Sequence, residues 1–435
     1  MNFMIIGVII LFVLMISGVP VVTAFLATMV FLIWQGGYDP SFLLPYGFSR
    51  INTIVLLALP LFVIAGGLME QGGIAEKLVG SGNNLFGRIK GGLAVMNVIA
   101  CGLFGAISGS AMATVSCIGS IMGPRMIKAG YPRGLTASLV SSAGVLGLLI
   151  PPSLLMILYA WLSNTSILKC FLATLIPGLM VIAGLCISSL IMLRNSKTIE
   201  VVKKIEKKVK MPKYDENGHR LFGSGPALLM PIIILGGIYS GIFTTTEAAA
   251  VSAIYAIPVG FWIYRGLSIH SLGQTLYTAG VSTGVIMVSG LGTTVLGRVF
   301  INENLHLVVL DLLKSVSDNN TVILLILNFI IIILGMLMDD DAVVLLIIPI
   351  LTPIITGLGI DLIHFAGIIG VNVGAANITP PTAPVVYLAA RVTNVEFKEL
   401  LPTLLIYMFV VYLPVLLLVT IFPGLSTWLP NLVLG

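Results

Sequence analysis

The residues whose chemistry stands out lie at two breaks in apolar runs, each marked by a proline pair. These are Pro151-Pro152-Ser153 and Pro380-Pro381-Thr382. Proline has no backbone N–H and clashes with the carbonyl one turn earlier, so each pair leaves carbonyl oxygens without donors. In an apolar environment such unpaired groups are costly, and a cation can satisfy them. The two breaks therefore predict cation sites.

Small polar residues accompany both breaks. Ser108-Gly109-Ser110 interrupts the apolar run before the first break, and Asn377 and Thr379 directly precede the second proline pair. Hydroxyl, amide and carbonyl oxygens without thiolate or imidazole suit a hard cation such as Na⁺. The N-termini of half-helices at a break also favour anions. One such motif alone could equally be a kinked helix with a closely packed turn, but two copies favour a functional site.

Three consecutive carboxylates, Asp339-Asp340-Asp341, stand between two apolar runs. Carboxylates inside a membrane are costly and usually functional, although a polar turn beside a water-filled cavity would look the same. We expect Asp339 to take part in an ion site, and a role for Asp340 and Asp341 stays open.

The elements that position these residues must be membrane helices. Of 435 residues, 58% are hydrophobic and 9% are charged, against about 25% charged in soluble domains. This composition excludes a soluble globular domain, a disordered chain and a disulfide scaffold. The apolar runs are continuous and longer than the alternating segments of about ten residues in a β-barrel. The sequence predicts an all-α polytopic membrane protein.

Charge orients the apolar runs, because short basic loops stay in the cytoplasm. The stretch 194–220 holds nine of the 22 Lys and Arg residues, so we expect a cytoplasmic loop over 194–225 rather than a nucleic-acid site. Basic residues flank 91–107 and 110–127 at both ends, which predicts a re-entrant hairpin entering from the cytoplasm. Acidic residues flank 320–338 and 341–357, so that hairpin should enter from outside.

This scheme places 18 basic residues on the cytoplasmic side and four on the outer side, namely Arg50, Lys169, Arg298 and Lys314. It gives about nine full spans and two hairpins, with the N-terminus inside and the C-terminus outside. The stretch 3–34, taken as one apolar segment, has no charge that would orient it.

The two hairpin regions also match in sequence. A shift of 229 residues that aligns the proline pairs also places Pro124 on Pro353 and Gly130 on Gly359 without a gap. Helix breakers that agree are stronger evidence than matching Val or Ile residues in so apolar a chain. Two copies with opposite predicted orientation form an inverted-topology repeat, which is typical of a secondary transporter.

These motifs, in this order, resemble the large membrane subunit of the tripartite ATP-independent periplasmic (TRAP) transporters, the DctM-like family. The resemblance covers nearly the whole chain and includes Ser108-Gly109-Ser110 and Gly147-x-x-Ile150-Pro151-Pro152-Ser153. In the second half it includes Gly335-Met336 with Asp339, and Thr379-Pro380-Pro381. Arg125 and Leu362 depart from the family, where an acidic residue and proline are common.

The resemblance implies an elevator-type transporter, in which a moving domain of two hairpins and two broken helices slides against a scaffold. It also implies Na⁺ symport of a small organic anion (a dicarboxylate, keto acid or sugar acid) across the bacterial inner membrane. Substrate would come from a periplasmic substrate-binding protein, and a separate small subunit of four helices would brace the scaffold. The expected units are 1–90 (N-terminal scaffold), 91–160 (first hairpin and broken helix), 168–265 (scaffold with the basic loop), 273–318 (connecting helix and outer loop), 320–392 (second hairpin and broken helix) and 399–435 (C-terminal helix).

The resemblance also assigns site residues. The first Na⁺ site would use Ser108 and Ser110 with carbonyls near Gly147, Ile150 and Pro152. By pseudo-symmetry, the second would lie near Leu337, Asp339, Ala376, Thr379 and Pro381. The expected substrate contacts are Ser108, Gly109, Ser110, Pro151, Asn377, Thr379 and Pro380. Asn377 adds a polar group that is unusual there, so the substrate could differ from a simple dicarboxylate.

Two other functions remain to be weighed. A related elevator carrier could work alone, coupled to Na⁺ or H⁺, without a binding protein; composition does not separate it from the first interpretation. An intramembrane enzyme is disfavoured, because Ser108 has no glycine two residues before it and no histidine is expected at matching depth. The sequence predicts no enzyme activity and no organic cofactor.

Overall fold

The computed structural model describes residues 2–79, 91–194, 223–380 and 383–435, and every regular element in these ranges is a helix. The expected all-α architecture is confirmed. Most of the basic loop, together with Pro381 and Thr382, lies outside the described residues.

The N-terminal region differs from the sequence prediction, because the apolar stretch 3–34 is two helices that pack on each other. Gly18 takes a left-handed conformation with φ of +82°, and Pro20 directly precedes the second helix. Glycine accepts this conformation without strain, so the Ser-Gly-Val-Pro stretch makes the turn. The elements are α1 (Asn2–Ile16), α2 (Val21–Gly36), α3 (Pro40–Ile51), the 3₁₀ turn η1 (Ile54–Leu57) and α4 (Ala58–Gln71).

The first hairpin region has the elements that the sequence predicts. Its two arms contact each other and turn at Gly109-Ser110. The following helix breaks at the proline pair, where its two parts meet at an angle of 41°. The elements are α6 (Gly92–Ser108), α7 (Ala111–Lys128), α8 (Arg133–Gly144), α9 (Leu146–Leu149), α10 (Leu154–Ser163) and α11 (Ile167–Leu193).

The second hairpin region repeats this order. Its arms turn at Met338-Asp339, and the following helix again breaks before the second proline pair. The elements are α17 (Asn320–Leu337), α18 (Asp340–Gly357), α19 (Leu362–Ala376), α20 (Pro384–Thr393), α21 (Phe397–Tyr407), the π-helical turn η3 (Met408–Tyr412) and α22 (Leu413–Ile421).

The remaining elements connect and flank these two regions. The helix α14 begins with a capping box formed by Thr244 and Glu247. The outer loop expected before residue 318 is wrong in part, because it contains the helix α16. These elements are α13 (Gly225–Tyr239), α14 (Thr245–Pro258), the π-helical turn η2 (Val259–Ile263), α15 (Ile269–Asn302), α16 (Leu305–Val316) and α23 (Gly424–Leu434).

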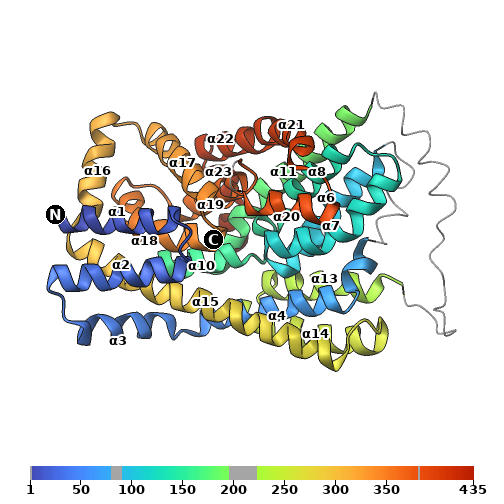
Figure 1. Ribbon diagram of the computed structural model, residues 1–435, viewed down its shortest axis with the longest axis horizontal. Coiled ribbons are helices and arrows are strands. Elements are labelled where there is room, and N and C mark those ends of the chain that lie inside the picture. The colour runs from blue at the N-terminus through green and yellow to red at the C-terminus, as the bar shows by residue number, and fades with distance from the viewer. Residues whose placement is uncertain (1, 80–90, 195–222, 381–382) are drawn as a thin grey trace.

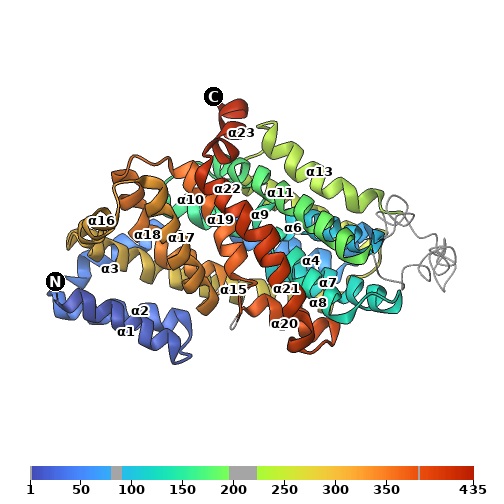
Figure 2. The ribbon, with the colours of Figure 1, turned by 90° about the horizontal axis from the view of Figure 1, so that it is seen from above.

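The two hairpins lie toward opposite ends of the molecule, with the broken helices between them (Figures 1 and 2). Each broken helix bridges both hairpins: α8 packs on its own hairpin arm α7, whereas α10 packs on α18 of the other hairpin. The second repeat mirrors this, since α19 contacts α18 and α20 packs on α7. Likewise α11 packs on α19, and α21 packs on α8. This exchange of partners agrees with the inverted repeat that the sequence predicts.

Within the described residues, seven helices are long and apolar enough to cross a membrane, or eight if the bent α8–α10 pair is one span. Both arms of the second hairpin are among the seven, while α6 and four other apolar helices are shorter. Length and composition do not say which shorter helices cross. The count of nine spans, the re-entrant path of each hairpin and the division into scaffold and moving domain therefore stay predictions.

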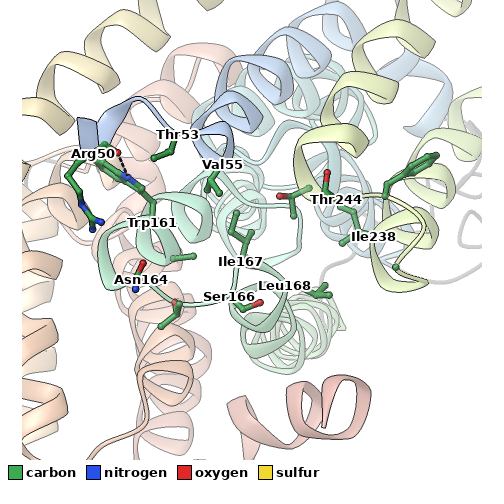
Figure 3. Close-up of a pocket in the computed structure, with 15 residues that line it drawn as sticks. Arg50, Thr53, Val55, Trp161, Asn164, Ser166, Ile167, Leu168, Ile238 and Thr244 are labelled. Atoms are coloured by element: carbon green, nitrogen blue, oxygen red, sulfur yellow. Dashed lines mark hydrogen bonds between the residues drawn. The ribbon is translucent and has the colours of Figure 1, made fainter. Parts of the chain in front are cut away.

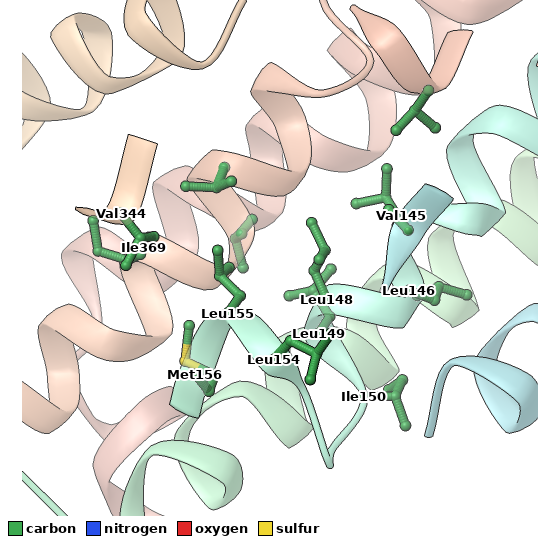
Figure 4. Packing of buried hydrophobic residues seen from close by; sticks show 14 of the residues in the cluster. Val145, Leu146, Leu148, Leu149, Ile150, Leu154, Leu155, Met156, Val344 and Ile369 are labelled. Carbon is green, nitrogen blue, oxygen red and sulfur yellow. The ribbon is translucent and has the colours of Figure 1, made fainter. Parts of the chain in front are cut away.

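Buried apolar side chains pack around the first break (Figure 4). The side chains of Leu146, Leu148 and Leu149 in α9 are at most 1% exposed. A Cβ built on Gly374 would stand 2.7 Å from Val145 Cγ1, so α19 approaches α9 closely. In a bilayer such close packing, rather than exclusion of water, drives helix association. The two breaks are thus held next to each other.

Candidate functional site: the hairpin tips and helix breaks

The tip of the first hairpin is a tight turn that presents hydroxyl groups. Gly109 ends α6 in a left-handed conformation with φ of +63°. Ser110 then caps α7, its hydroxyl oxygen accepting from the Ala113 N–H at 3.5 Å. A serine at this position satisfies an N–H that the first turn of a helix leaves without a partner. The Ser-Gly-Ser spacing therefore fixes both the turn and the start of α7.

Three oxygens gather directly behind this tip. The Thr114 hydroxyl donates to the Ser110 carbonyl at 2.7 Å, and its oxygen lies 3.2 Å from the Ser108 hydroxyl oxygen. Ser108 and Thr114 are buried, 3% and 0% exposed. The sequence reasoning missed Thr114. Its place four residues after Ser110, on the same helix face, was the signal that could have found it.

The tip of the first hairpin packs tightly against the first helix break, and we call this contact the clamp. The Leu154 N–H at the start of α10 donates to the Gly109 carbonyl at 3.2 Å. A Cβ on Gly147 would stand 2.6 Å from the Ser110 carbonyl oxygen and 2.7 Å from the Thr114 hydroxyl. A Cβ on Gly109 would stand 3.1 Å from the Pro152 carbonyl oxygen. The structure therefore brings together Ser108, Gly109, Ser110, Gly147 and Pro152, as the sequence analysis expects.

The break itself leaves polar groups without partners. The Ile150 N–H still donates to the Leu146 carbonyl at 2.8 Å. Pro151 and Pro152 have no N–H, so the carbonyls of Gly147 and Leu148 lack their usual donors. The buried Ser153 hydroxyl also has no partner among the described residues. Carbonyl and hydroxyl oxygens at one buried place are the donor set that a hard monovalent cation prefers.

The tip of the second hairpin is built differently. Leu337 is 46% exposed, and Asp339 is exposed at the N-cap position of α18 without a side-chain capping bond. The close contact to the broken helix comes one turn earlier, where a Cβ on Gly335 would stand 2.5 Å from Ala376 Cβ. The described residues include no hydrogen bond from Asp339 to the second break.

The second break holds one unpartnered amide. Asn377 is 2% exposed, and its Nδ2 has no hydrogen-bond partner among the described residues. Thr379 is 7% exposed, and its hydroxyl donates to the Ala375 carbonyl at 2.7 Å. Pro381, expected in the second ion site, lies outside the described residues. The second set is therefore brought together only in part.

A buried polar network next to the second break is structural in character. The Asn372 amide donates to the Asn328 side chain at 3.0 Å, and the Asn328 amide donates to the Thr420 hydroxyl at 2.8 Å. These bonds join α17, α19 and α22. Buried networks of this kind hold helices in one arrangement. The sequence reasoning did not predict this network.

A cavity between α3, α10, α11 and α14 lies away from the hairpin tips. It has a volume of about 470 Å³ and lies between the end of α3, the α10–α11 turn and the start of α14. Figure 3 shows Arg50 at one edge and Thr244 at the opposite edge. In the part of the chain that the structure describes, no three His, Cys, Asp or Glu side chains gather at metal distance.

Comparison with known proteins decides the family. The family described as "Tripartite ATP-independent periplasmic transporter, DctM component" matches residues 8–425. The chain belongs to this family. A C4-dicarboxylate TRAP transporter large permease protein DctM of Pseudomonas aeruginosa is 34% identical over 390 residues, covering 88% of each chain. A sialic acid TRAP transporter large permease protein SiaM of Vibrio cholerae is 33% identical over 427 residues, covering 97% of this chain.

A longer relative and a solved structure complete the comparison. The isethionate TRAP transporter permease protein DctMQ of Oleidesulfovibrio alaskensis is 30% identical; the match covers 94% of this chain but 64% of that protein. The YdaH transporter of Alcanivorax borkumensis, solved as a crystal structure with an unusual topology, has a TM-score of 0.66 over 89% of this chain and 88% of its own. At 14% identity, this similarity concerns the fold alone.

Membership of the DctM family makes the chain a multi-pass membrane transporter subunit rather than an enzyme. It also implies two partners, a small membrane subunit and a periplasmic binding protein. The TRAP resemblance that the sequence motifs carried is therefore confirmed.

Proposed function

We propose that this chain is the large permease subunit of a Na⁺-coupled importer in the bacterial inner membrane. It would take a small organic anion from a periplasmic binding protein. The observation that supports this proposal is the tight contact of the first hairpin tip with the α9–α10 break. It brings the oxygens of Ser108, Ser110 and Thr114 beside freed carbonyls. Na⁺ would replace water there and satisfy these groups.

A second Na⁺ would bind near Leu337, Asp339, Ala376, Thr379 and Pro381. Pseudo-symmetry supports this site, because Gly335 packs on Ala376 much as the first tip packs on Gly147. Asp339 would add a carboxylate oxygen at the position that corresponds to Ser110. The first site would then bind Na⁺ with neutral oxygens, and the second would bind Na⁺ with a carboxylate as well.

The substrate would lie between the two tips, near Ser108, Gly109, Ser110, Pro151, Asn377, Thr379 and Pro380. The named relatives carry C4-dicarboxylate, sialic acid and isethionate, which are all organic anions. The unpartnered Asn377 amide supports a contact with a substrate oxygen. Bound Na⁺ beside it would offset part of the negative charge of the substrate.

Transport would follow an elevator path. The two hairpins and broken helices interlock through the α10–α18 and α7–α20 contacts, which supports their moving as one body. The remaining helices, braced by a small subunit of four helices, would form the fixed scaffold. The match covers 64% of the longer DctMQ relative, so that protein has a further part outside the region that this chain matches.

The test is uptake into proteoliposomes that contain this chain and its small subunit. The binding protein is loaded with labelled ligand, identified by thermal-shift screening of organic acids. We expect uptake only with an inward Na⁺ gradient and with the binding protein, and none when K⁺ replaces Na⁺. Uptake of free ligand without the binding protein would make the chain a stand-alone carrier and contradict the proposal.

A further inference from the structure

A second cavity lies beside the one described above and has one more arginine in its wall, Arg298. Its volume is about 250 Å³, and Arg50 and Trp161 line both cavities. It lies between α3, α10, α15 and α18, which places it between the proposed scaffold and the arm of the second hairpin. Its main polar and aromatic lining residues are Tyr46, Arg50, Trp161, Thr294, Arg298 and Thr352.

Two guanidinium groups without a counter-charge face this cavity. No carboxylate is among the residues that line it, and neither Arg50 nor Arg298 forms an ion pair with another described residue. Arg298 lies over the Tyr46 ring, 5.5 Å from its centroid, and its Nε is buried without a hydrogen-bond partner. Arg298 is half-buried, and an arginine without a counter-charge near the end of a membrane helix is a functional-site candidate.

The nearest acidic residue along α15 is already engaged. Glu303 accepts a hydrogen bond from the Tyr38 hydroxyl at 2.5 Å. Burial, and then this bond to the carboxylate, raises the pKa of Tyr38 to about 12, so the phenol keeps its proton. Glu303 is therefore bonded to Tyr38 rather than to Arg298.

The larger cavity is less suited to an anion. The helix starts at Ser166 and Thr244 line it, but their side chains cap their own helices. The Glu247 carboxylate bonds to the Thr244 N–H at 2.8 Å, which brings a negative charge to that wall. The smaller cavity, with two arginines and no acid, is the better site.

We propose that the cavity between α3, α10, α15 and α18 binds the carboxylate of the transported anion between Arg50 and Arg298, before the anion reaches the hairpin tips. Arginine presents paired N–H donors that match a carboxylate. The hydroxyls of Thr294 and Thr352 already donate to carbonyls of their own helices at 2.8 and 2.7 Å. These two residues would therefore shape the wall of the cavity without adding charge to it. This inference rests on the proposed function.

The test is equilibrium binding to the purified chain with its small subunit in nanodiscs, without binding protein or ion gradient. The labelled probes are succinate and N-acetylneuraminate, and unlabelled succinamide is the neutral competitor. We expect saturable binding of at least one probe, weakened at least about tenfold by Arg298→Gln and by Arg50→Gln. Arg298→Lys should weaken binding less than Arg298→Gln, because it keeps the charge but loses the paired donors. Lys314→Gln, which removes an exposed positive charge on α16, is the control and should bind like the wild type.

Several outcomes would overturn the proposal. They are no saturable binding of either probe, competition by succinamide equal to that by succinate, or unchanged affinity in both arginine variants. Unchanged affinity would leave these arginines as anchors for lipid headgroups. Uptake distinguishes this failure from failure of the proposed function. If Na⁺-dependent uptake persists while the arginine variants keep a normal KM, only the cavity assignment is wrong.

Discussion

The two hairpins share one topology but meet their broken helices differently. The first tip touches backbone: Gly109 and Ser110 lie against Gly147, Pro152 and Leu154. The second hairpin contacts a side chain instead, because Gly335 packs on the Ala376 Cβ, and Asp339 stays exposed. Ser108 and Ser110 correspond to Leu337 and Asp339 in the repeat. A repeated fold therefore supports one buried site of neutral oxygens and one open site with a carboxylate.

The difference between the two hairpins is tested most strongly by a substitution at Gly147. Its counterpart in the second repeat, Ala376, already carries a Cβ. In Gly147→Ala the new methyl would meet the Ser110 carbonyl at 2.6 Å, and backbone cannot rotate away. Overpacking of this kind costs about 1–3 kcal/mol, so we expect Na⁺-driven uptake to fall by up to about a hundredfold. Ala376→Gly should have only a small effect.

The matched control for this substitution is Gly280→Ala on α15, since nothing lies within 4 Å of a Cβ built there. If Gly147→Ala transported as well as Gly280→Ala, the clamp would not be needed for transport.

The hydroxyl of Thr114 has no counterpart in the second repeat, where Val343 stands. Thr114→Val keeps the shape but removes the bond to the Ser110 carbonyl at 2.7 Å. A hydrogen bond contributes about 1 kcal/mol, so the Na⁺ concentration for half-maximal uptake should rise about five- to tenfold. Thr356→Val removes a similar bond, to the Thr352 carbonyl at 2.8 Å, far from both tips. Equal Na⁺ curves for the two variants would argue against a role of Thr114.

The exposed carboxylate of Asp339 should matter less than the buried hydroxyls. Exposed charges contribute about 0.2–1 kcal/mol, so Asp339→Asn should raise the half-maximal Na⁺ concentration by up to about fivefold. Asp318→Asn, at the far end of the same hairpin arm, is the control. A larger effect at Asp339 than at Thr114 would mean that the second site contributes more to Na⁺ binding than the first.

The smallest effect on transport should come from the Asn328–Asn372–Thr420 network. The corresponding residues in the first repeat are Ile99, Ala143 and Ile191, so only the second repeat uses polar bonds here. Asn328→Leu should lower the free energy of unfolding by about 1–3 kcal/mol without changing the Na⁺ dependence. Thermal unfolding in detergent measures this, with Asn320→Leu as the exposed control. A shifted Na⁺ curve would place the network in the ion site.

Sequence reasoning succeeded where helix breakers define local structure. The expected arms 91–107 and 110–127 are α6 and α7 to within one residue at each end, because Gly91, Gly109 and Ser110 set their ends. Sequence reasoning did not predict the helix α16, because the charges of this short segment are typical of an outer loop. It could not foresee that Asp339 stays exposed while Ser108 is buried, since that depends on how each hairpin meets its broken helix.

The central claim, that the clamped first hairpin is a Na⁺ site, is tested most directly by ²²Na⁺ binding to the purified chain with its small subunit. We expect saturable binding to the wild type, a reduced amount in Ser108→Ala, and a further reduction when Asp339→Asn is combined with it. Gly280→Ala should bind like the wild type. Unchanged ²²Na⁺ binding in Ser108→Ala, with the protein still folded by thermal unfolding, would contradict the account.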